Sequence, residues 1–197
     1  MLIVLIVIGA LAGLLLPALS TSKVKSQGIM CLNNNRQLCL AWHMYVDDNN
    51  DRFPDAFQWV PGKLDFDPQN PANTDPGVLQ KGLFNPYLAR STLVYRCPAD
   101  ESKVTGTQGK IPRIRSVSMN DAFSQTGPSL PASAGWKTYQ RRTDLVAPSP
   151  GMHWLLIDEH PDSIGDGAFG VNCQNQGAGA RFVDFPAAFH SRAASLG

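Results

Sequence analysis

The sequence predicts an α+β protein in which a long N-terminal helix packs on a small antiparallel sheet with long loops. Three observations lead to this fold class. Residues 1–48 contain a single proline, and their apolar residues recur at helical spacing. Proline and glycine become frequent after residue 53, and the apolar segments there are short and bounded by turn residues. The length of 197 residues leaves room for one ordinary domain beyond the helix.

Residues 1–19 contain no charged or strongly polar side chain. A helix of this length spans about 28 Å, close to the thickness of the hydrocarbon core of a bilayer. We therefore expect residues 1–20 to form the transmembrane half of the helix, in which Pro17 is tolerated. One alternative is a secretory signal cleaved after Ser20, since Ala18-Leu19-Ser20 loosely fits a small-x-small site. Another is a buried core helix, but apolarity on every side is typical of a membrane helix.

Residues 21–50 are expected to continue the helix as an amphipathic stem. The predicted apolar stripe comprises Cys31, Leu32, Leu38, Cys39, Trp42, Tyr45 and Val46. The predicted polar face comprises Lys25, Asn33, Asn34, Arg36, Gln37, His43 and Asp47. The acidic and amide-rich run at residues 47–51, followed by Pro54, predicts the end of the helix near Asp48.

Residues 51–197 are expected to form a loop-rich β head domain. Residues 53–92 read mainly as loop, with a short helix at residues 82–91. The predicted strands are Leu93–Arg96, Ile111–Met119, Met152–Asp158 and Ala168–Val171. The simplest assembly is an antiparallel sheet of about three to five strands packed on the stem.

Charge and motifs exclude several classes of function. The chain has 17 Lys and Arg against 16 Asp and Glu, so a net charge of +1 gives no electrostatic basis for binding nucleic acid. We find no nucleophile elbow and no phosphate-binding loop in a strand-to-helix context. The sequence therefore predicts no catalytic residues and a protein that is not an enzyme.

The four cysteines contain no C-x-x-C pair, so a zinc ribbon or a thioredoxin-type motif is unsupported. Cys31 and Cys39 would lie about 12 Å apart along one helix, too far for a disulfide between them. A disulfide from a helix cysteine to Cys97, in the loop segment RCPAD, fits better. The alternative is a set of buried thiols in a reducing compartment.

The N-terminal segment LIVLIVIGALAGLLLPALSTSKVKSQGIMCLNNNRQLCLAWHMYVDDNND resembles that of type IV pilin-like proteins and type II secretion pseudopilins. The likeness is greatest to the branch that has a prepilin-type N-terminus and a late His, nine residues, Asp-Gly motif. Four later segments agree with this branch: YRCPADES (95–102), RSVSMN (115–120), LLIDEHPDSIGDGAFG (155–170) and FVDFPAAFH (182–190). His190 matches the histidine of that motif.

The resemblance implies a structural subunit that assembles through its apolar helix into a membrane-based filament or a secretion-associated pseudopilus. Its partners would be other pilin-like subunits, the membrane through residues 1–19, and secretion or assembly machinery. Small residues allow close approach of such helices, and here they are Gly9, Ala10, Ala12 and Gly13, next to Pro17. We expect a single pass through the inner membrane, with the head in the periplasm or outside the cell.

Two features depart from the family and bear on topology. The leader, processing site and buried glutamate of the family have no counterpart before Met1, and the Asp-Gly of the late motif has none after His190, so we expect both ends to be truncated. Lys23 and Lys25 follow the span, and the positive-inside rule would by itself place the head in the cytoplasm. We follow the resemblance, because a disulfide between Cys31 and Cys97 requires an oxidising compartment.

Four acids crowd the loop that follows residues 153–157: Asp158, Glu159, Asp162 and Asp166. Hard cations such as calcium prefer several oxygen ligands from a glycine-containing loop, and some pseudopilins bind calcium in a late loop. The spacing is not that of an EF-hand, so exposed acids that cap turns are the alternative. A zinc site of His153, Asp158 and His160 is disfavoured, because the two histidines would face opposite sides of a strand. Calcium is thus the only cofactor that the sequence indicates.

Two other functions remain open from the sequence. One is a monomeric, membrane-tethered binding module whose head recognises a polysaccharide or a protein. The other is a secreted protein that signal peptidase releases with an N-terminus near Thr21.

Overall fold

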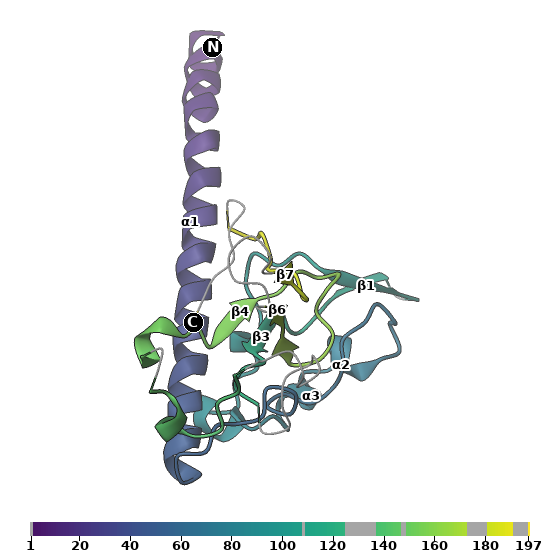
Figure 1. Ribbon diagram of the computed structural model, residues 1–197. Helices are drawn as coiled ribbons and strands as arrows, with labels where there is room; N and C mark the ends of the chain where they lie inside the picture. The colour runs from purple at the N-terminus through teal and green to yellow at the C-terminus, as the bar shows by residue number, and fades with distance from the viewer. Residues whose placement is uncertain (1, 108, 125–136, 147–148, 173–180, 191–196) are drawn as a thin grey trace.

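The computed structural model describes residues 2–107, 109–124, 137–146, 149–172, 181–190 and 197. The side chains of residues 2, 5–7, 9, 10, 12, 14–20, 172 and 181 also lie outside this description. The chain begins with one uninterrupted helix, α1 (Leu2–Asp48), whose C-terminal half carries the head while its N-terminal half projects beyond it (Figure 1). The α+β class is therefore confirmed.

Helix α1 ends where the sequence predicts. Asn50 and Asp51 adopt positive φ angles of 55° and 61°, which break the helical path. The backbone N–H of Asp51 donates to the carbonyl of Val46 at 3.0 Å, satisfying one of the last carbonyl groups of the helix.

The buried face of the stem differs in part from the predicted stripe. Cys31, Leu38, Trp42 and Val46 are buried as expected, together with Asn35 and Ala41, whereas Cys39 and Tyr45 are half-buried. Leu32 was predicted to face the head, but it is 56% exposed. At about 100° per residue, Leu32 lies a little over a quarter of a turn beyond Cys31, which takes it off the buried face.

The head consists of short elements joined by loops. The helical turns are α2 (Pro71–Thr74), α3 (Pro76–Leu79), η1 (Asn85–Leu88), η2 (Leu93–Tyr95), η4 (Arg142–Asp144) and η5 (Pro150–Met152). The strands are β1 (Lys103–Gly106), β2 (Gly109–Pro112), β3 (Val117–Asn120), β4 (Leu156–Asp158), β5 (Ala168–Phe169), β6 (Val171–Asn172) and β7 (Arg181–Phe182). Among the described elements, the turns η1 and η2 contact α1 most extensively.

Over the described residues, the strands form three small sheets, and not one antiparallel sheet. The central sheet has the order β4-β3-β5, with β3 antiparallel to β4 and parallel to β5. The β1–β2 and β6–β7 pairs are separate and antiparallel.

Several predicted element boundaries were wrong. Leu93–Arg96, predicted as a strand, contains the 3₁₀ turn η2. The predicted strand Ile111–Met119 is divided between β2 and β3, which belong to different sheets. The segment at residues 70–79, predicted as loop, forms α2 and α3, because the Asn70 and Asp75 side chains each cap a single turn that begins with proline.

The hydrophobic core lies between the stem and the central sheet. The indole of Trp59 stacks on Tyr95 at a centroid distance of 5.7 Å and lies 5.2 Å from Phe84. Its Nε1–H donates to the carbonyl of Gly167 at 2.8 Å, so the indole also joins this core to the loop before β5. Stem residue Trp42 packs on Phe53 at 4.9 Å. These aromatic contacts hold the head against the C-terminal half of α1.

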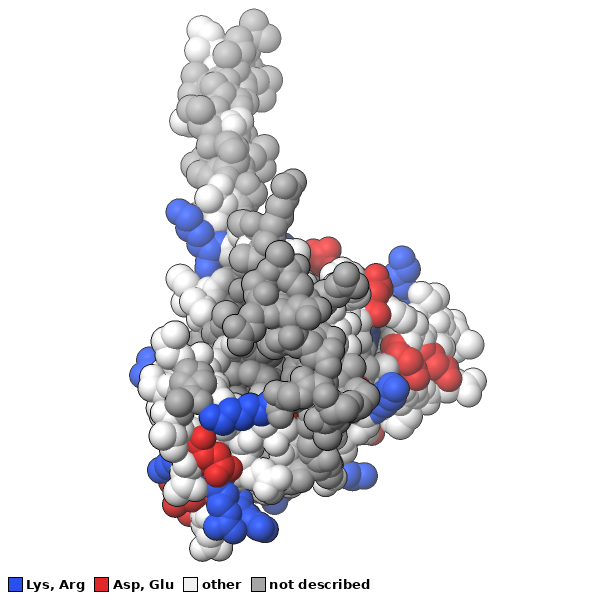
Figure 2. Space-filling model, viewed as in Figure 1, with Lys and Arg blue, Asp and Glu red and all other residues white. Residues whose placement is uncertain are grey.

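Over the part of the chain that the structure describes, no helix combines the length and the apolar character that crossing a membrane requires. Figure 2 shows basic and acidic side chains interspersed over the head, with neither sign forming a continuous face in that view.

Candidate metal centre

Four side chains that are potential metal ligands meet where the stem, the RCPAD loop, the central sheet and the last described segment converge. They are Cys31, Cys97, Asp158 and His190, and one potential ligand atom from each lies within 4.8 Å of the other three. Within the described ranges, this is the group of three or more Cys, His, Asp or Glu residues that comes together in this way. Cys31, Cys97 and Asp158 are buried, and His190 is half-buried.

The four ligand atoms are already paired with one another. The thiol of Cys31 donates to Oδ2 of Asp158 at 2.9 Å. The sulfur of Cys97 lies 3.1 Å from Nε2 of His190, within hydrogen-bond distance, and the tautomer of the imidazole decides which of the two groups donates. The cluster is therefore two thiols directed at a carboxylate and at an imidazole.

Each ligand is placed by ordinary local structure. Cys31 lies on the buried face of α1, and Asp158 is the last residue of β4. Cys97 opens a turn closed by the Asp100 N–H to Cys97 carbonyl bond of 3.0 Å, with Pro98 at the second position. His190 follows a segment fixed by the Ala187 N–H bond to the Asp158 carbonyl, at 2.8 Å.

A second layer of hydrogen bonds orients the cluster. The hydroxyl of Ser116 donates to Oδ1 of Asp158 at 3.2 Å and accepts from the backbone N–H of Cys97 at 2.8 Å. The backbone N–H of Ala99 points at the sulfur of Cys97 at 3.4 Å. Stem residues Gln27 and Asn34 donate to the carbonyls of Pro98 and Arg96, at 3.0 and 3.1 Å, and so hold the RCPAD loop to α1.

Cys31 and Cys97 were predicted to form a disulfide. The structure places the two sulfur atoms in one cluster, where they are not joined to each other. The disulfide itself stays a prediction. Neither Asp158 nor His190 was expected beside these cysteines, and Cys173 lies outside the described residues.

The four acids predicted to bind calcium are directed to different partners. Asp158 belongs to the cluster above, and Asp162 is exposed. Glu159 is buried and accepts from the Ser163 hydroxyl at 2.9 Å, and burial raises the pKa of its carboxyl to about 7. Oδ1 of Asp166 accepts from the Ala168 N–H at 2.9 Å.

Two buried arginines explain the shape of this acidic loop. Arg113 donates to the carbonyls of Pro161 and Ile164, at 2.6 and 3.3 Å. Arg115 donates to the carbonyls of Gly165 and Asp166, at 3.0 and 2.7 Å. Desolvation lowers the pKa of Arg115 to about 10, still well above neutrality. The carbonyl oxygens that a calcium ion needs are thus taken by guanidinium groups, and calcium binding here stays a prediction that the geometry does not favour.

The two histidines that were considered as zinc ligands from the sequence, His153 and His160, make other contacts. The ring of His153 packs against Tyr139 at a centroid distance of 4.7 Å. His160 is half-buried, and its Nδ1 accepts from the Asp162 N–H at 3.2 Å. Neither residue belongs to the group of ligands described above.

The small residues predicted to pack helices together lie on the projecting half of α1. The side chains of Ala10, Ala12 and Pro17, and the surroundings of Gly9, are outside the described set. Gly13 is exposed, and a Cβ built on it meets nothing within 4 Å. The projecting helix therefore has open space at Gly13.

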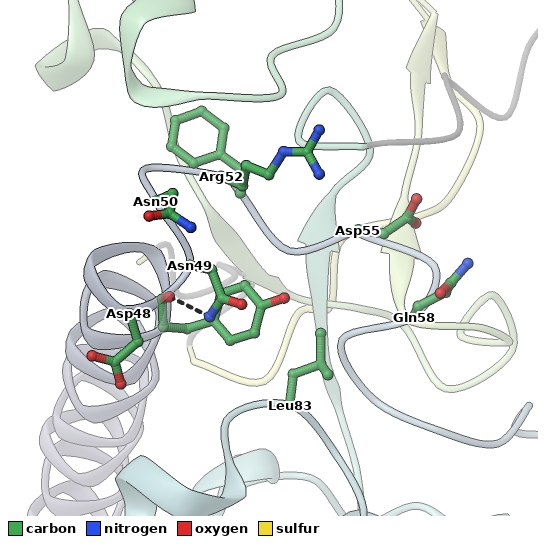
Figure 3. A pocket seen from close by; sticks show the side chains of 9 residues that line it. Asp48, Asn49, Asn50, Arg52, Asp55, Gln58 and Leu83 are labelled. Atoms are coloured by element: carbon green, nitrogen blue, oxygen red, sulfur yellow. Dashed lines mark hydrogen bonds between the residues drawn. The ribbon is translucent and has the colours of Figure 1, made fainter.

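Two hollows lie beside the stem. One, of about 510 Å³, is lined mainly by polar side chains at the C-terminal end of α1, including Asp48, Asn49, Arg52, Asp55 and Gln58 (Figure 3). The other, of about 740 Å³, is a more apolar groove between α1 and the β2 region. Its lining includes Met30, Leu93, Ile111 and Cys97, so it reaches the four-residue cluster.

No family model, curated protein or solved structure matches this chain. The resemblance to pilin-like proteins therefore rests on the quoted sequence segments.

Proposed function

We propose that this chain is a structural subunit of the type IV pilin-like class that assembles side by side with further copies through α1. The proposal has two supports in the molecule. One is the length of α1, which extends well past the head that it carries (Figure 1). The other, which carries the proposal, is the apolar surface that the helix leaves uncovered.

The stem is apolar on two opposite sides. One side is the buried face around Leu38 and Trp42. Exposed apolar side chains lie on the other side, at Ile29, Leu32, Leu40 and Met44. At about 100° per residue, this second group centres roughly half a turn of the helix away from the first. We call these four residues the outer stripe.

A second copy of the chain is the occupant that best fits the outer stripe. Clustered exposed apolar residues of this kind mark interaction surfaces. The stripe continues into the projecting half, where Ile3, Val4, Ile8 and Leu11 are exposed as well. A parallel copy of α1 would cover both halves along one line, and open space at Gly13 permits close approach.

Residues 1–19 would anchor each subunit in the inner membrane as a single pass, since this run has no charged side chain. The head would then be displayed in the periplasm or outside the cell. Other pilin-like subunits and secretion or assembly machinery would be its partners.

The test compares charged substitutions on the outer stripe with one on the head. The double variant Ile29→Glu, Leu40→Glu places two carboxylates in the proposed contact, and Leu93→Glu, at a position 83% exposed on η2, is the control. We expect the wild type and Leu93→Glu to form oligomers in mild detergent by light scattering, and short filaments by electron microscopy. The double variant should be monomeric with an unchanged circular dichroism spectrum. Oligomers of equal size in all three proteins would contradict the proposal.

The polar hollow in Figure 3 favours one alternative, a monomeric tethered module that binds a polar ligand at the end of the stem. A wild-type chain that stays monomeric and membrane-bound in the same experiment would support that function. A mature protein that begins near Thr21 would instead support release by signal peptidase.

A further inference from the structure

We propose that Cys31, Cys97, Asp158 and His190 form a tetrahedral zinc site that fastens the stem helix to the head. The ligand atoms would be the two thiolates, one carboxylate oxygen and Nε2 of the imidazole. This inference does not depend on the proposed function, because it concerns how the stem and head are held together in any assembly state.

The kinds of ligand select the metal. Two thiolates and an imidazole are soft and borderline ligands, which suit zinc and are poor ligands for calcium or magnesium. A carboxylate is an accepted fourth ligand of zinc. Four protein ligands with no coordination position left open are typical of structural zinc sites, not of catalytic ones.

The distances require only small movements of the ligand atoms. With zinc bonds of about 2.0–2.3 Å, neighbouring ligand atoms in a tetrahedron lie about 3.3–3.8 Å apart. The Cys31 Sγ to Asp158 Oδ2 distance is 2.9 Å and the Cys97 Sγ to His190 Nε2 distance is 3.1 Å, so these two contacts would lengthen by about half an ångström. All four atoms fall within 4.8 Å of one another, so any of the remaining pairs would shorten by about 1 Å at most.

The existing hydrogen bonds are the ones that zinc would replace. The thiol hydrogen of Cys31 points at the carboxylate, and the Cys97 thiol faces the imidazole. When Zn²⁺ binds, two sulfur–zinc bonds form and two S–H bonds break. The two protons pass to solvent, and no oxidant or reductant is involved. Two thiolates and one carboxylate bring three negative charges, of which the ion balances two.

The supporting groups fit a metal site as well. Ser116 binds the carboxylate oxygen Oδ1 while Oδ2 faces the cluster, which is the outer-layer role that orients a ligating carboxylate. The Ala99 N–H points at the Cys97 sulfur and would stabilise a thiolate. The groove of about 740 Å³ that reaches Cys97 supplies an access route for the ion.

The chief rival for the same atoms is a disulfide between Cys31 and Cys97. The two thiols cannot be bonded to each other and to zinc at once, so the states exclude one another. In the disulfide state Asp158 would lose its thiol donor, although it would keep Ser116. The metal content and thiol count of the same sample therefore separate the two.

The experiment uses the full chain with Cys173→Ser, which removes the cysteine outside the described residues. The protein is purified under reducing conditions, stripped of metal with a chelator, and titrated with Zn²⁺ alone. We expect elemental mass spectrometry to find one zinc per chain. At a pH where both thiols are protonated, the binding of each zinc should release two protons. Titration with Co²⁺ should give the sulfur-to-cobalt charge-transfer band and the intense visible absorption of tetrahedral cobalt.

Matched variants locate the site. Cys31→Ser and His190→Ala should abolish stoichiometric binding, and Ser116→Ala should weaken it by about 10- to 100-fold. Cys39→Ser is the control, because Cys39 lies two turns along the same helix and outside the cluster. If Cys31→Ser fails to fold, the half-buried His190 provides the decisive variant.

Three results would overturn the proposal. One is less than stoichiometric zinc in reduced wild-type protein. Another is zinc retained by both Cys31→Ser and His190→Ala. The last is a Cys31–Cys97 disulfide that persists in protein isolated with zinc present and without added oxidant.

Discussion

Truncation of Leu38 tests the packing of the stem on the head. The Leu38 side chain is fully buried in the main core, and Leu38→Ala removes three carbon groups from it. At about 0.8 kcal/mol per buried carbon group, the loss is about 2.4 kcal/mol, and the remaining cavity raises the total to about 3–4 kcal/mol. For a chain of this size, each kcal/mol corresponds to a Tm decrease of about 2–4 °C. The expected decrease is therefore roughly 6–16 °C.

The assay is thermal unfolding followed by tryptophan fluorescence, since Trp42 and Trp59 both lie in the same core. The matched control is Leu40→Ala, only two positions away but 60% exposed on the outer stripe, which should change the free energy of unfolding by less than about 0.5 kcal/mol. Equal Tm values for the two variants, or a larger decrease for Leu40→Ala, would refute the assignment of the buried and outer faces of α1.

Three further changes have expected outcomes of their own. Gly167→Ala should reduce the free energy of unfolding by about 1–3 kcal/mol, because its Cβ would lie 2.7 Å from Nε1 of Trp59 and 3.0 Å from the Ala56 carbonyl oxygen. Gly165→Ala, whose Cβ meets only the flexible end of Lys63 at 3.4 Å, is the control, and equal chemical denaturation curves would count against this packing. Gly13→Leu should leave the circular dichroism spectrum and membrane insertion unchanged, but it should reduce the yield of chemically cross-linked oligomers. A yield equal to that of the wild type would argue against helix packing as the cause of assembly. A calcium-selective chelator in excess should leave the Tm unchanged, because Arg113 and Arg115 donate hydrogen bonds to the carbonyls of the acidic loop. A decrease in Tm that is reversed by added calcium would instead support a calcium site in this loop.

The stem was predictable because its signals are local. A proline-free stretch with helical apolar spacing, closed by residues that adopt positive φ angles, fixes both the helix and its end near Asp48. The orientation of single residues was less predictable. Leu32 is apolar yet exposed, and the face at which a helix meets its neighbour depends on contacts that the sequence of the helix does not contain.

The strands were harder to predict, since each has only two to four residues. Such short runs carry little periodicity, and their pairing depends on distant partners, as in the parallel contact of β3 with β5. The short helices α2 and α3 did leave a local signal. In NPANTDPG, Asn70 and Asp75 each stand directly before a proline and cap one helical turn, a pattern that can be read as two capped turns rather than as loop.

The four-residue cluster could be predicted only in part. The positions of two members could be predicted from local patterns, because Cys31 lies on the apolar side of the helix and Cys97 lies in a Cys-Pro turn. The positions of Asp158 and His190 depend on where β4 ends and on the bridge between Glu159 and Pro186, which are tertiary features. The spacing of the four residues along the chain matches no compact zinc motif.

Site-specific photocross-linking of α1 in membranes tests whether the chain assembles through the outer stripe. A photoreactive phenylalanine derivative replaces Leu40 in one protein and the exposed head residue Leu93 in another. On illumination, we expect a ladder of multiples of the 21.4 kDa chain from position 40, and far fewer such products from position 93. Monomer alone from position 40, in protein that is folded and membrane-bound, would contradict it.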